Sequence, residues 1–209
     1  MRPKTFTFSP VSSSATGFLS DATGATWTLS NTATTDGLAH QVTIVNDSVT
    51  DHSAKTAVLV GTDAAGNPQT ETVNLPGTSA TVTGSKYFKT LTSITPSATI
   101  GADTMDIGWA APGVGAIYPV DFNSVTRGGI SLGVSITGTI NYDVQHTLDD
   151  IFASPTAHQS ANWFDHSSIA AKTASSDGNY AFPIRAVRLL VNSVTNGATV
   201  SFTILQGAR

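Results

Sequence analysis

Three kinds of residue are scarce in this chain. Its 209 residues include no cysteine, a single glutamate at position 71 and only 11% charged residues. The lack of cysteine excludes disulfides, thiolate zinc ligands and cysteine nucleophiles. Long helices usually draw on Glu, Lys, Arg and Leu, so their scarcity argues against a helical fold. Stability must therefore come from core burial or from association.

Long apolar runs and basic clusters are also missing. No window approaches the roughly 18 apolar residues of a membrane helix, and the N-terminus lacks the apolar segment of a secretory signal. We therefore expect a chain made and kept in the cytosol, with no membrane partner. The net charge is −4 and the ten basic residues are dispersed, whereas nucleic-acid binding requires clustered Lys and Arg. No nucleic-acid partner is expected.

Hydroxyl and β-branched residues take the place of charges. Ser and Thr occupy 55 of 209 positions, about a quarter. Thr and Val suit pleated strands, and apolar residues recur with a period of two at Val42 and Ile44, and again at Val73 and Leu75. Residues 63–68 carry a Gly and a Pro between two such runs, which predicts a hairpin loop joining antiparallel strands. The expected fold class is all-β.

The small, turn-forming residues 110–115 divide the chain. We expect two β-sandwich or jelly-roll-like modules in tandem, an N-terminal module over 1–112 and a C-terminal module over 113–209. Residues 11–39 are interpreted as loop and edge. In the second module two apolar stripes predict half-buried strands, and the Asn196-Gly197 pair predicts a closing hairpin with a primed turn.

A long irregular loop is expected over residues 148–177, and it has two interpretations. Its aromatic side chains either cap an open end of the sandwich or make a protein contact in which Trp163 and Phe164 anchor a neighbouring subunit. Large aromatic residues usually bury, which favours the first interpretation.

No catalytic pattern is present. The Gly-x-Ser-x-Gly elbow and both glycine-rich phosphate loops are missing, so we expect no enzyme and no cofactor. A cluster of imidazole and carboxylate groups would suit a structural ion, but turn residues solvated on the surface are the favoured interpretation and no metal is assigned. That cluster is His146, Asp149, Asp150, His158, Asp165 and His166.

Several residues are candidates for contacts between subunits. Glu71 shares a strand face with Val73 and is expected at an edge or interface, with Lys86 or Lys89 as partner. Arg185 and Arg188 are expected on opposite faces of a strand, where one of them holds an interface carboxylate. The alternation of residues 5–8, which includes Phe6 and Phe8, predicts an N-terminal arm that adds a strand to a neighbouring subunit.

Two groups of segments resemble virion structural proteins of tailed bacteriophages. The first comprises Val58 to Val73 and Lys86 to Ile94, and the second comprises Tyr142 to Asp150, Trp163 to His166, Arg185 to Leu189 and Thr203 to Gln206. The resemblance implies a head decoration (cement) protein, or else a small head-fibre or tail component. It carries no catalytic residues.

The expected function follows from the resemblance and the composition together. We expect a virion protein that forms a homo-oligomer, with a trimer favoured, and that binds the major capsid protein or other virion proteins and stabilises the head lattice. The alternative from another class is a carbohydrate-binding β-sandwich module, in which Trp163, Phe164 and Trp109 stack on sugars. A hydrolase is the third and least favoured interpretation.

Overall fold

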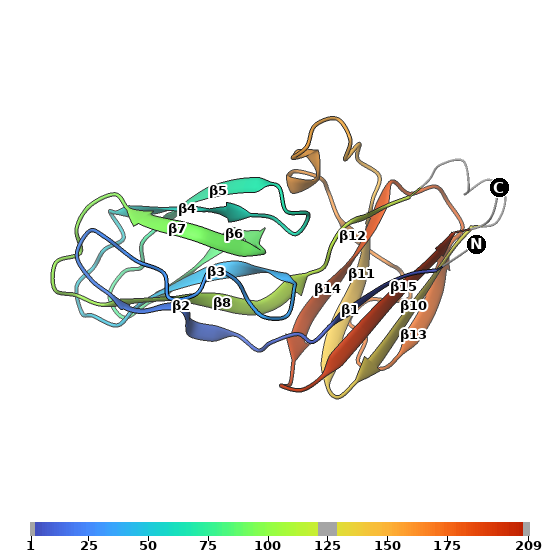
Figure 1. Ribbon diagram of the computed structural model, residues 1–209, viewed down its shortest axis with the longest axis horizontal. Helices are drawn as coiled ribbons and strands as arrows, with labels where there is room; N and C mark the ends of the chain where they lie inside the picture. Colours follow the sequence, from blue (N-terminus) through green and yellow to red (C-terminus); the bar gives the residue numbers. More distant parts are fainter. Residues whose placement is uncertain (1–2, 121–128, 207–209) are drawn as a thin grey trace. The chain divides into compact units, whose positions relative to one another are not determined.

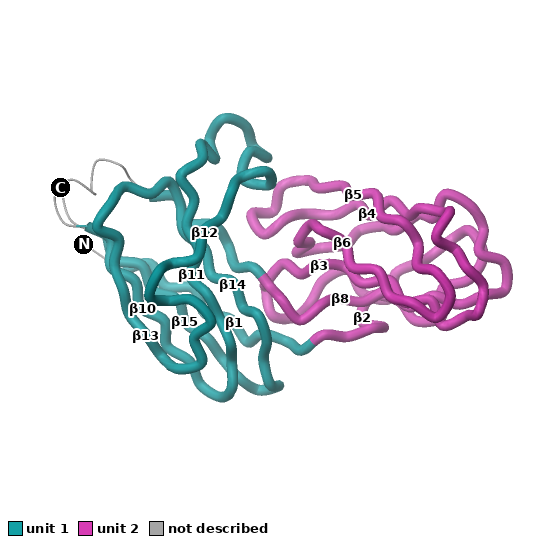
Figure 2. The backbone as a smooth tube through the Cα atoms, turned by 180° about the vertical axis from the view of Figure 1, so that it is seen from behind, with its two compact units in different colours: residues 1–12, 114–209 teal, residues 13–113 magenta. Residues whose placement is uncertain are grey.

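The computed structural model describes residues 3–120 and 129–206, and the all-β fold class is confirmed. The chain divides into two compact units (Figure 2): unit 1 holds residues 1–12 and 114–209, and unit 2 holds residues 13–113. Unit 2 is thus inserted into unit 1 between residues 12 and 114. The expected tandem division at residue 112 is close to the second crossing point, but it wrongly assigns the first 12 residues to the N-terminal module.

Unit 2 is built from seven strands in two antiparallel sheets (Figure 1). One sheet has the order β5-β4-β7, and in the other β8 pairs β3 and β2 while β3 also pairs β6. The strands are β2 (Ser14–Ala22), β3 (Ala39–Asn46), β4 (Thr56–Thr62), β5 (Pro68–Asn74), β6 (Thr81–Phe88), β7 (Thr90–Pro96) and β8 (Met105–Val114), of which the last residue belongs to unit 1.

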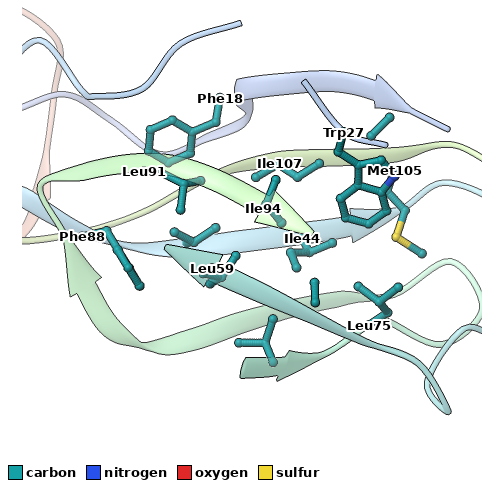
Figure 3. Close-up of a cluster of buried hydrophobic side chains, with 14 of the residues drawn as sticks. Phe18, Trp27, Ile44, Leu59, Leu75, Phe88, Leu91, Ile94, Met105 and Ile107 are labelled. Atoms are coloured by element: carbon teal, nitrogen blue, oxygen red, sulfur yellow. The ribbon is translucent and has the colours of Figure 1, made fainter. Parts of the chain in front are cut away.

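The core of unit 2 consists of alternate side chains from both sheets (Figure 3). Ile44 of β3, Leu59 of β4 and Ile107 of β8 are each at most 1% exposed. The hairpin predicted around residues 63–68 is confirmed, because β4 and β5 pair antiparallel across it and Gly66 has a φ of 88°. Apolar burial of this kind is the main force that holds the two sheets together.

Strand β2 lies where the sequence predicts loop and edge. It pairs with β8 through an irregular register, in which Leu19 lies opposite Ile107 and shifts occur on both sides. Its small and hydroxyl residues show no period of two, so the sequence pattern does not predict this strand. Phe18, 1% exposed, is the side chain that ties it to the core.

Unit 1 also contains two sheets, with the orders β1-β15-β10-β13 and β12-β11-β14; β9 pairs with β14. Alternate residues of these strands form a second core, as the predicted stripes of residues 130–136 and 140–144 require. The elements are β1 (Lys4–Phe8), β9 (Tyr118–Pro119), β10 (Ile130–Thr137), β11 (Ile140–Thr147), the 3-10 turn η1 (Ala157–Gln159), β12 (Phe164–Asp165), β13 (Ser176–Tyr180), β14 (Ala186–Val194) and β15 (Thr199–Gln206).

The predicted closing hairpin is wrong. β14 pairs with β11 and β15 pairs with β10 and β1, so the Asn196-Gly197 turn leads from one sheet to the other. Gly197 has a φ of 85°, but Asn196 is not in the left-handed region, so the turn is not the type I′ turn that this pair usually favours. The Asn-Gly signal located the turn and not the pairing of its strands.

The predicted N-terminal arm also differs from the structure. Lys4–Phe8 forms β1 and pairs along its whole length with β15 of the same chain, with Phe6 opposite Phe202. The alternation that predicted a strand was correct, but the strand completes the sheet of its own chain. This pairing is the reason why the first residues belong to unit 1.

Candidate interaction surfaces

The outer face of the β1-β15-β10-β13 sheet carries almost no charge. Register places twelve residues on this face, and eight of them are Ser or Thr. Asp177 is the one charged residue of the twelve and Leu205 the one large apolar residue. We call this set the hydroxyl face: Thr5, Thr7, Ser131, Gly133, Ser135, Thr137, Asp177, Asn179, Thr199, Ser201, Thr203 and Leu205.

Hydroxyl groups on this face bond to one another across strands. The Oγ1 atoms of Thr5 and Thr203 are 2.9 Å apart, and Thr7 Oγ1 lies 3.0 Å from Ser201 Oγ. A hydroxyl both donates and accepts, so a paired hydroxyl keeps the capacity to bond to a second surface. A surface with so few ions has little charge to desolvate when it is covered.

Phe6 and Phe8 lie on the other side of β1, away from the hydroxyl face. Phe6 packs edge-on against Tyr118 with ring centroids 6.3 Å apart, and Lys4 Nζ lies 5.1 Å from the centroid of the Phe6 ring. Phe8 lies close to Gly115, where a Cβ would approach the Phe8 ring to 3.1 Å. Both predicted contact residues are half-buried within unit 1, so they hold β1 in place.

Residues 148–177, expected as a long loop, cover the polar side of β11. We call them the covering segment. Asp143 accepts hydrogen bonds from the Ala171 amide and from Asn192 Nδ2. Gln145 Nε2 donates to Asp165 Oδ1, 2.9 Å away. Because these side chains are buried, the expected half-buried β11 is enclosed on both faces. The segment is also more ordered than expected, since residues 164–165 form β12 along the edge of β11.

Arg188 and Arg185 fasten this covering segment. The Arg188 guanidinium lies 4.1 Å from the centroid of the Trp163 ring, and its Nε donates to Gln145 Oε1. Arg185 Nη2 bonds to Asp150 Oδ1 at 2.9 Å, and the hydrogen bond from Arg185 lowers the pKa of Asp150 below its usual range. Both arginines therefore serve contacts within the chain.

Aromatic side chains are exposed along the covering segment and the turn before β14. Phe152 is 57% exposed, Phe164 51% and Phe182 48%, and Leu148 is exposed as well. These are the three exposed phenylalanines among the described residues. Exposed aromatic residues are frequent anchors of protein contacts, and Phe164 is such an anchor in the second, less favoured interpretation of the long loop.

Behind these phenylalanines lies a buried cluster of aromatic rings and imidazoles. The Tyr180 ring is flanked by His146 at 5.0 Å and His166 at 4.8 Å, and Phe164 and Phe182 pack against His146. Burial, together with the charge of His166, lowers the pKa of His146, and Asp165 opposes this shift. Burial also raises the pKa of Tyr180. The neutral His146 and Tyr180 rings therefore support Phe164 and Phe182 near physiological pH.

Glu71 is engaged within unit 2. Its Oε1 accepts hydrogen bonds from the Ser85 amide and hydroxyl at 2.6 and 2.7 Å, and its Oε2 accepts one from the Lys86 amide at 3.2 Å. The expected edge position is confirmed, because β5 is an outer strand of its sheet. The partners are Ser85 and the backbone amide of Lys86, not the Lys86 ammonium group that was expected. The Lys86 Nζ atom donates to the Thr70 carbonyl. Gly84 permits the approach, since a Cβ there would lie 2.8 Å from Oε2.

A shallow hollow of ≈ 230 Å³ opens on unit 2 beside Trp109. No charged side chain lines it. Trp109 was named by the sequence as an aromatic candidate, whereas the hydroxyl groups around it were not, because residues 13–15 were interpreted as loop. The lining residues are Ser13, Ser14, Ala15, Thr43, Val45, Thr81, Trp109 and Ala110.

The described residues contain no group of three or more His, Asp and Glu side chains placed to hold a metal ion. Among the candidates, His146 lies in the aromatic cluster, whereas Asp149 accepts hydrogen bonds from Asn162 and Asp150 from Arg185. In the same part of the chain, no helix has the length and apolar character needed to cross a membrane.

Comparison with known proteins gives no relative for this chain. No family model matches it, and neither the curated proteins nor the solved structures contain a significant match.

Proposed function

We propose that the protein is a structural subunit of a tailed-bacteriophage particle, a decoration protein that binds the head lattice and stabilises it. The observation that carries this proposal is the hydroxyl face, a four-stranded surface with one charged residue among twelve. The resemblance of residues 58–73 and 142–150 to virion proteins supports the same assignment. A subunit of this kind works by area of contact and needs no reaction centre.

The energetics of the hydroxyl face suit a permanent contact. Specific interfaces bury about 800 Å² on each partner, and charged groups at their centre cost free energy to desolvate. Thr5, Thr7, Ser201 and Thr203 already pair across strands, so a partner covers them without leaving unbonded polar groups. The hydroxyl face is therefore the surface that we assign to the lattice.

The exposed phenylalanines supply a second contact. Phe152, Phe164 and Phe182 are each about half exposed. The His146 ring backs Phe164 and Phe182, and the Arg185 guanidinium lies over the Phe152 ring. Anchors of this type carry much of the binding energy of an interface. We assign them to contacts between copies of the protein in a homo-oligomer. A trimer is the favoured oligomer because it matches threefold positions of a lattice.

Charge placed on the hydroxyl face tests the assignment. The double variant Ser135→Lys/Ser201→Lys adds two cations at positions opposite one another in β10 and β15. Co-sedimentation with phage heads assembled without this protein should weaken by more than about tenfold, because each buried unpaired charge costs several kcal/mol. The control Thr72→Lys adds a cation to exposed β5 of unit 2 and should bind like the parent chain.

The outcomes separate the alternatives. Equal binding of the double variant and the parent chain contradicts the role of the hydroxyl face. Binding of the parent chain to isolated tails and not to heads contradicts decoration and favours a tail component. Thermal unfolding of each variant identifies any loss of binding that is due to misfolding.

A further inference from the structure

The outer edge of β1 has no backbone partner among the described residues. Strand β1 ends the sheet order β1-β15-β10-β13 and pairs with β15 alone. Its two side-chain hydrogen bonds, made by Thr5 and Thr7, also go to β15. No other described residue bonds to its backbone. The amide and carbonyl groups that point away from β15 therefore form an open edge to which another strand can add.

Neighbouring elements protect the other outer strands. At the far end of the same sheet, the Asn179 carbonyl of β13 accepts a hydrogen bond from His166 Nε2 at 3.0 Å. In unit 2, Glu71 of β5 accepts hydrogen bonds from the Ser85 and Lys86 amides of β6. The Lys86 side chain bonds to a carbonyl of β5, and loop residues bond to the backbones of β2 and β7. Among the described outer strands of five or more residues, only β1 lacks such a bond.

The sequence of β1 is complementary to a second copy of itself. When two copies lie antiparallel with their Phe6 residues opposite each other, Thr5 of one copy faces Thr7 of the other. This pair repeats the hydroxyl pairs that β1 makes with β15. In the same register Lys4 faces Phe8, and Lys4 already lies over an aromatic ring in its own chain. The two Lys4 residues are separated by about 13 Å along the strands, so no like charges meet.

The area of the hydroxyl face also favours a second copy. Its four strands measure roughly 19 Å across and 22 Å along, which gives a footprint of about 400 Å². A specific interface covers about 800 Å² on each partner. The twofold axis of an antiparallel strand pair is perpendicular to the sheet, so pairing through β1 places both hydroxyl faces on the same side. Two copies together therefore present a continuous surface of the size that a specific interface needs.

We propose that β1 is a dimerisation strand. The β1 edges of two copies pair antiparallel about Phe6 and join two four-stranded sheets into one sheet of eight strands. This contact differs from the N-terminal arm expected from the sequence, because β1 stays in the sheet of its own chain. It also uses other residues than the exposed phenylalanines. The pairing stands without the particle role, whereas the binding of a lattice by the joined hydroxyl faces rests on the proposed function.

The absence of cysteine makes the register directly testable. Thr5→Cys and Thr7→Cys chains are mixed in equal amounts, oxidised and separated by non-reducing electrophoresis. In the mixture the introduced cysteines lie opposite each other, with Cα atoms about 4.5–5.5 Å apart, within the range of a disulfide. In either variant alone they are more than about 7 Å apart, beyond that range. We expect cross-linked dimer from the mixture and little from either variant alone. A mixture of Thr70→Cys and Thr72→Cys, exposed on β5, is the matched control and should give none.

Charges at the same two positions test the pairing without a cross-link. Thr5→Lys/Thr7→Lys places like charges opposite each other twice, and should raise the dissociation constant of the dimer more than about tenfold in analytical ultracentrifugation. Thr5→Lys/Thr7→Glu places opposite charges at both pairs and should restore dimerisation to within about threefold of the parent chain. Because both variants carry two charges on β1, this restoration separates repulsion between copies from misfolding. Thr70→Lys/Thr72→Lys on β5 should dimerise like the parent chain.

Three results would overturn the proposal. One is a parent chain that is monomeric up to about 1 mM. Another is equal cross-linking of the β1 mixture and the β5 control mixture. The third is equal dissociation of the two charge variants of β1. None of these measurements uses phage heads, so their failure leaves the particle role to the co-sedimentation experiment. A chain that pairs through β1 but does not sediment with heads contradicts the particle role and keeps the β1 contact.

Discussion

Glu71 Oε1 of β5 accepts hydrogen bonds from both the backbone amide and the hydroxyl of Ser85 in β6, at 2.6 and 2.7 Å. The two strands belong to different sheets of unit 2, and each is an outer strand. The one glutamate of the chain therefore closes an open side of the unit, with the Lys86 amide as a third donor. An edge strand left open in this way would otherwise present unpaired backbone groups to other chains.

Glu71→Gln should destabilise unit 2. The amide keeps the shape of the side chain but places an NH₂ group against a backbone or hydroxyl donor, so at least one hydrogen bond to a charged acceptor is lost. We expect a loss of about 1–2 kcal/mol in the free energy of unfolding, measured in urea. Asp177→Asn, which removes a carboxylate from exposed β13, is the control; equal midpoints for both variants would show that the Glu71 contact contributes nothing.

Asp36 and His40 form a buried hydrogen-bonded pair, and breaking this pair should cost more stability than the loss of the Glu71 contact. Asp36 Oδ2 lies 2.9 Å from His40 Nε2, while its Oδ1 accepts hydrogen bonds from Thr34 and the Leu38 amide. Asp36→Asn should lower the free energy of unfolding by about 3 kcal/mol, because the imidazole loses its buried carboxylate. Asp103→Asn weakens the contact with His52, in which the Asp103 carboxylate is partly exposed, and should cost less than about 1 kcal/mol. The reverse order would contradict the account.

The Asp36–His40 pair should also make the free energy of unfolding depend on pH in acid. Burial alone would raise the pKa of Asp36, but the hydrogen bond and charge of His40, together with the hydrogen bonds from Thr34 and the Leu38 amide, outweigh burial and hold the pKa below 3.8. The unfolded chain therefore takes up this proton first, so the stabilisation is present above about pH 3.8 and is lost as the pH falls through the folded pKa. Asp36→Asn should remove this component from a plot of unfolding midpoint against pH.

His146 predicts a second pH dependence, in unit 1. Burial and the neighbouring His166 lower its pKa below 6.5, so below that value the unfolded chain binds a proton that the folded chain resists. Stability should fall as the pH drops from about 6.5 through the folded pKa. His146→Phe preserves the ring packed against Phe182 and should flatten this slope, whereas His158→Gln should not. A slope unchanged by His146→Phe would assign the titration to another group.

Arg188 should control the exposure of Trp163. Arg188→Lys keeps the charge but loses the planar stack at 4.1 Å and the hydrogen bond from Nε to Gln145. We expect stronger acrylamide quenching of tryptophan fluorescence and a loss of about 1 kcal/mol in stability. In a Trp163→Phe background the quenching difference should vanish; if it persists, the covering segment is held by other contacts.

The sequence predicts which residues form strands and which side chains are buried better than it predicts which strands pair with one another. The alternation in residues 130–136 and 140–144 identified which side chains are buried, because a strand has a fixed period of two. It did not specify which sheet each strand joins. The Asn196-Gly197 turn is compatible either with a hairpin or with a crossover between sheets, and the structure has the crossover. Choosing between them requires the long-range pairing of β15 with β1 and β10.

The candidate interaction surfaces show the same contrast between local features, which the sequence predicts, and long-range contacts, which it does not. Phe164 was expected as an exposed anchor only in the less favoured of two interpretations of the long loop, and it is 51% exposed. Arg185, Arg188 and Glu71 were predicted at interfaces because charged groups next to apolar strands need partners. Their partners lie in the same chain but far along the sequence, which no local pattern reveals. The hydroxyl face has a sequence signal, the alternation of Ser or Thr with apolar residues in 199–204, but its significance appears only when four such strands lie side by side.

The measurement that tests the central claim most directly is light scattering of the purified protein, alone and after titration into phage heads assembled without it. Decoration predicts a discrete oligomer in solution and binding that saturates at a fixed number of copies for each head, with heads that then resist heating better. A monomer that leaves the mass and heat resistance of the heads unchanged would contradict the account.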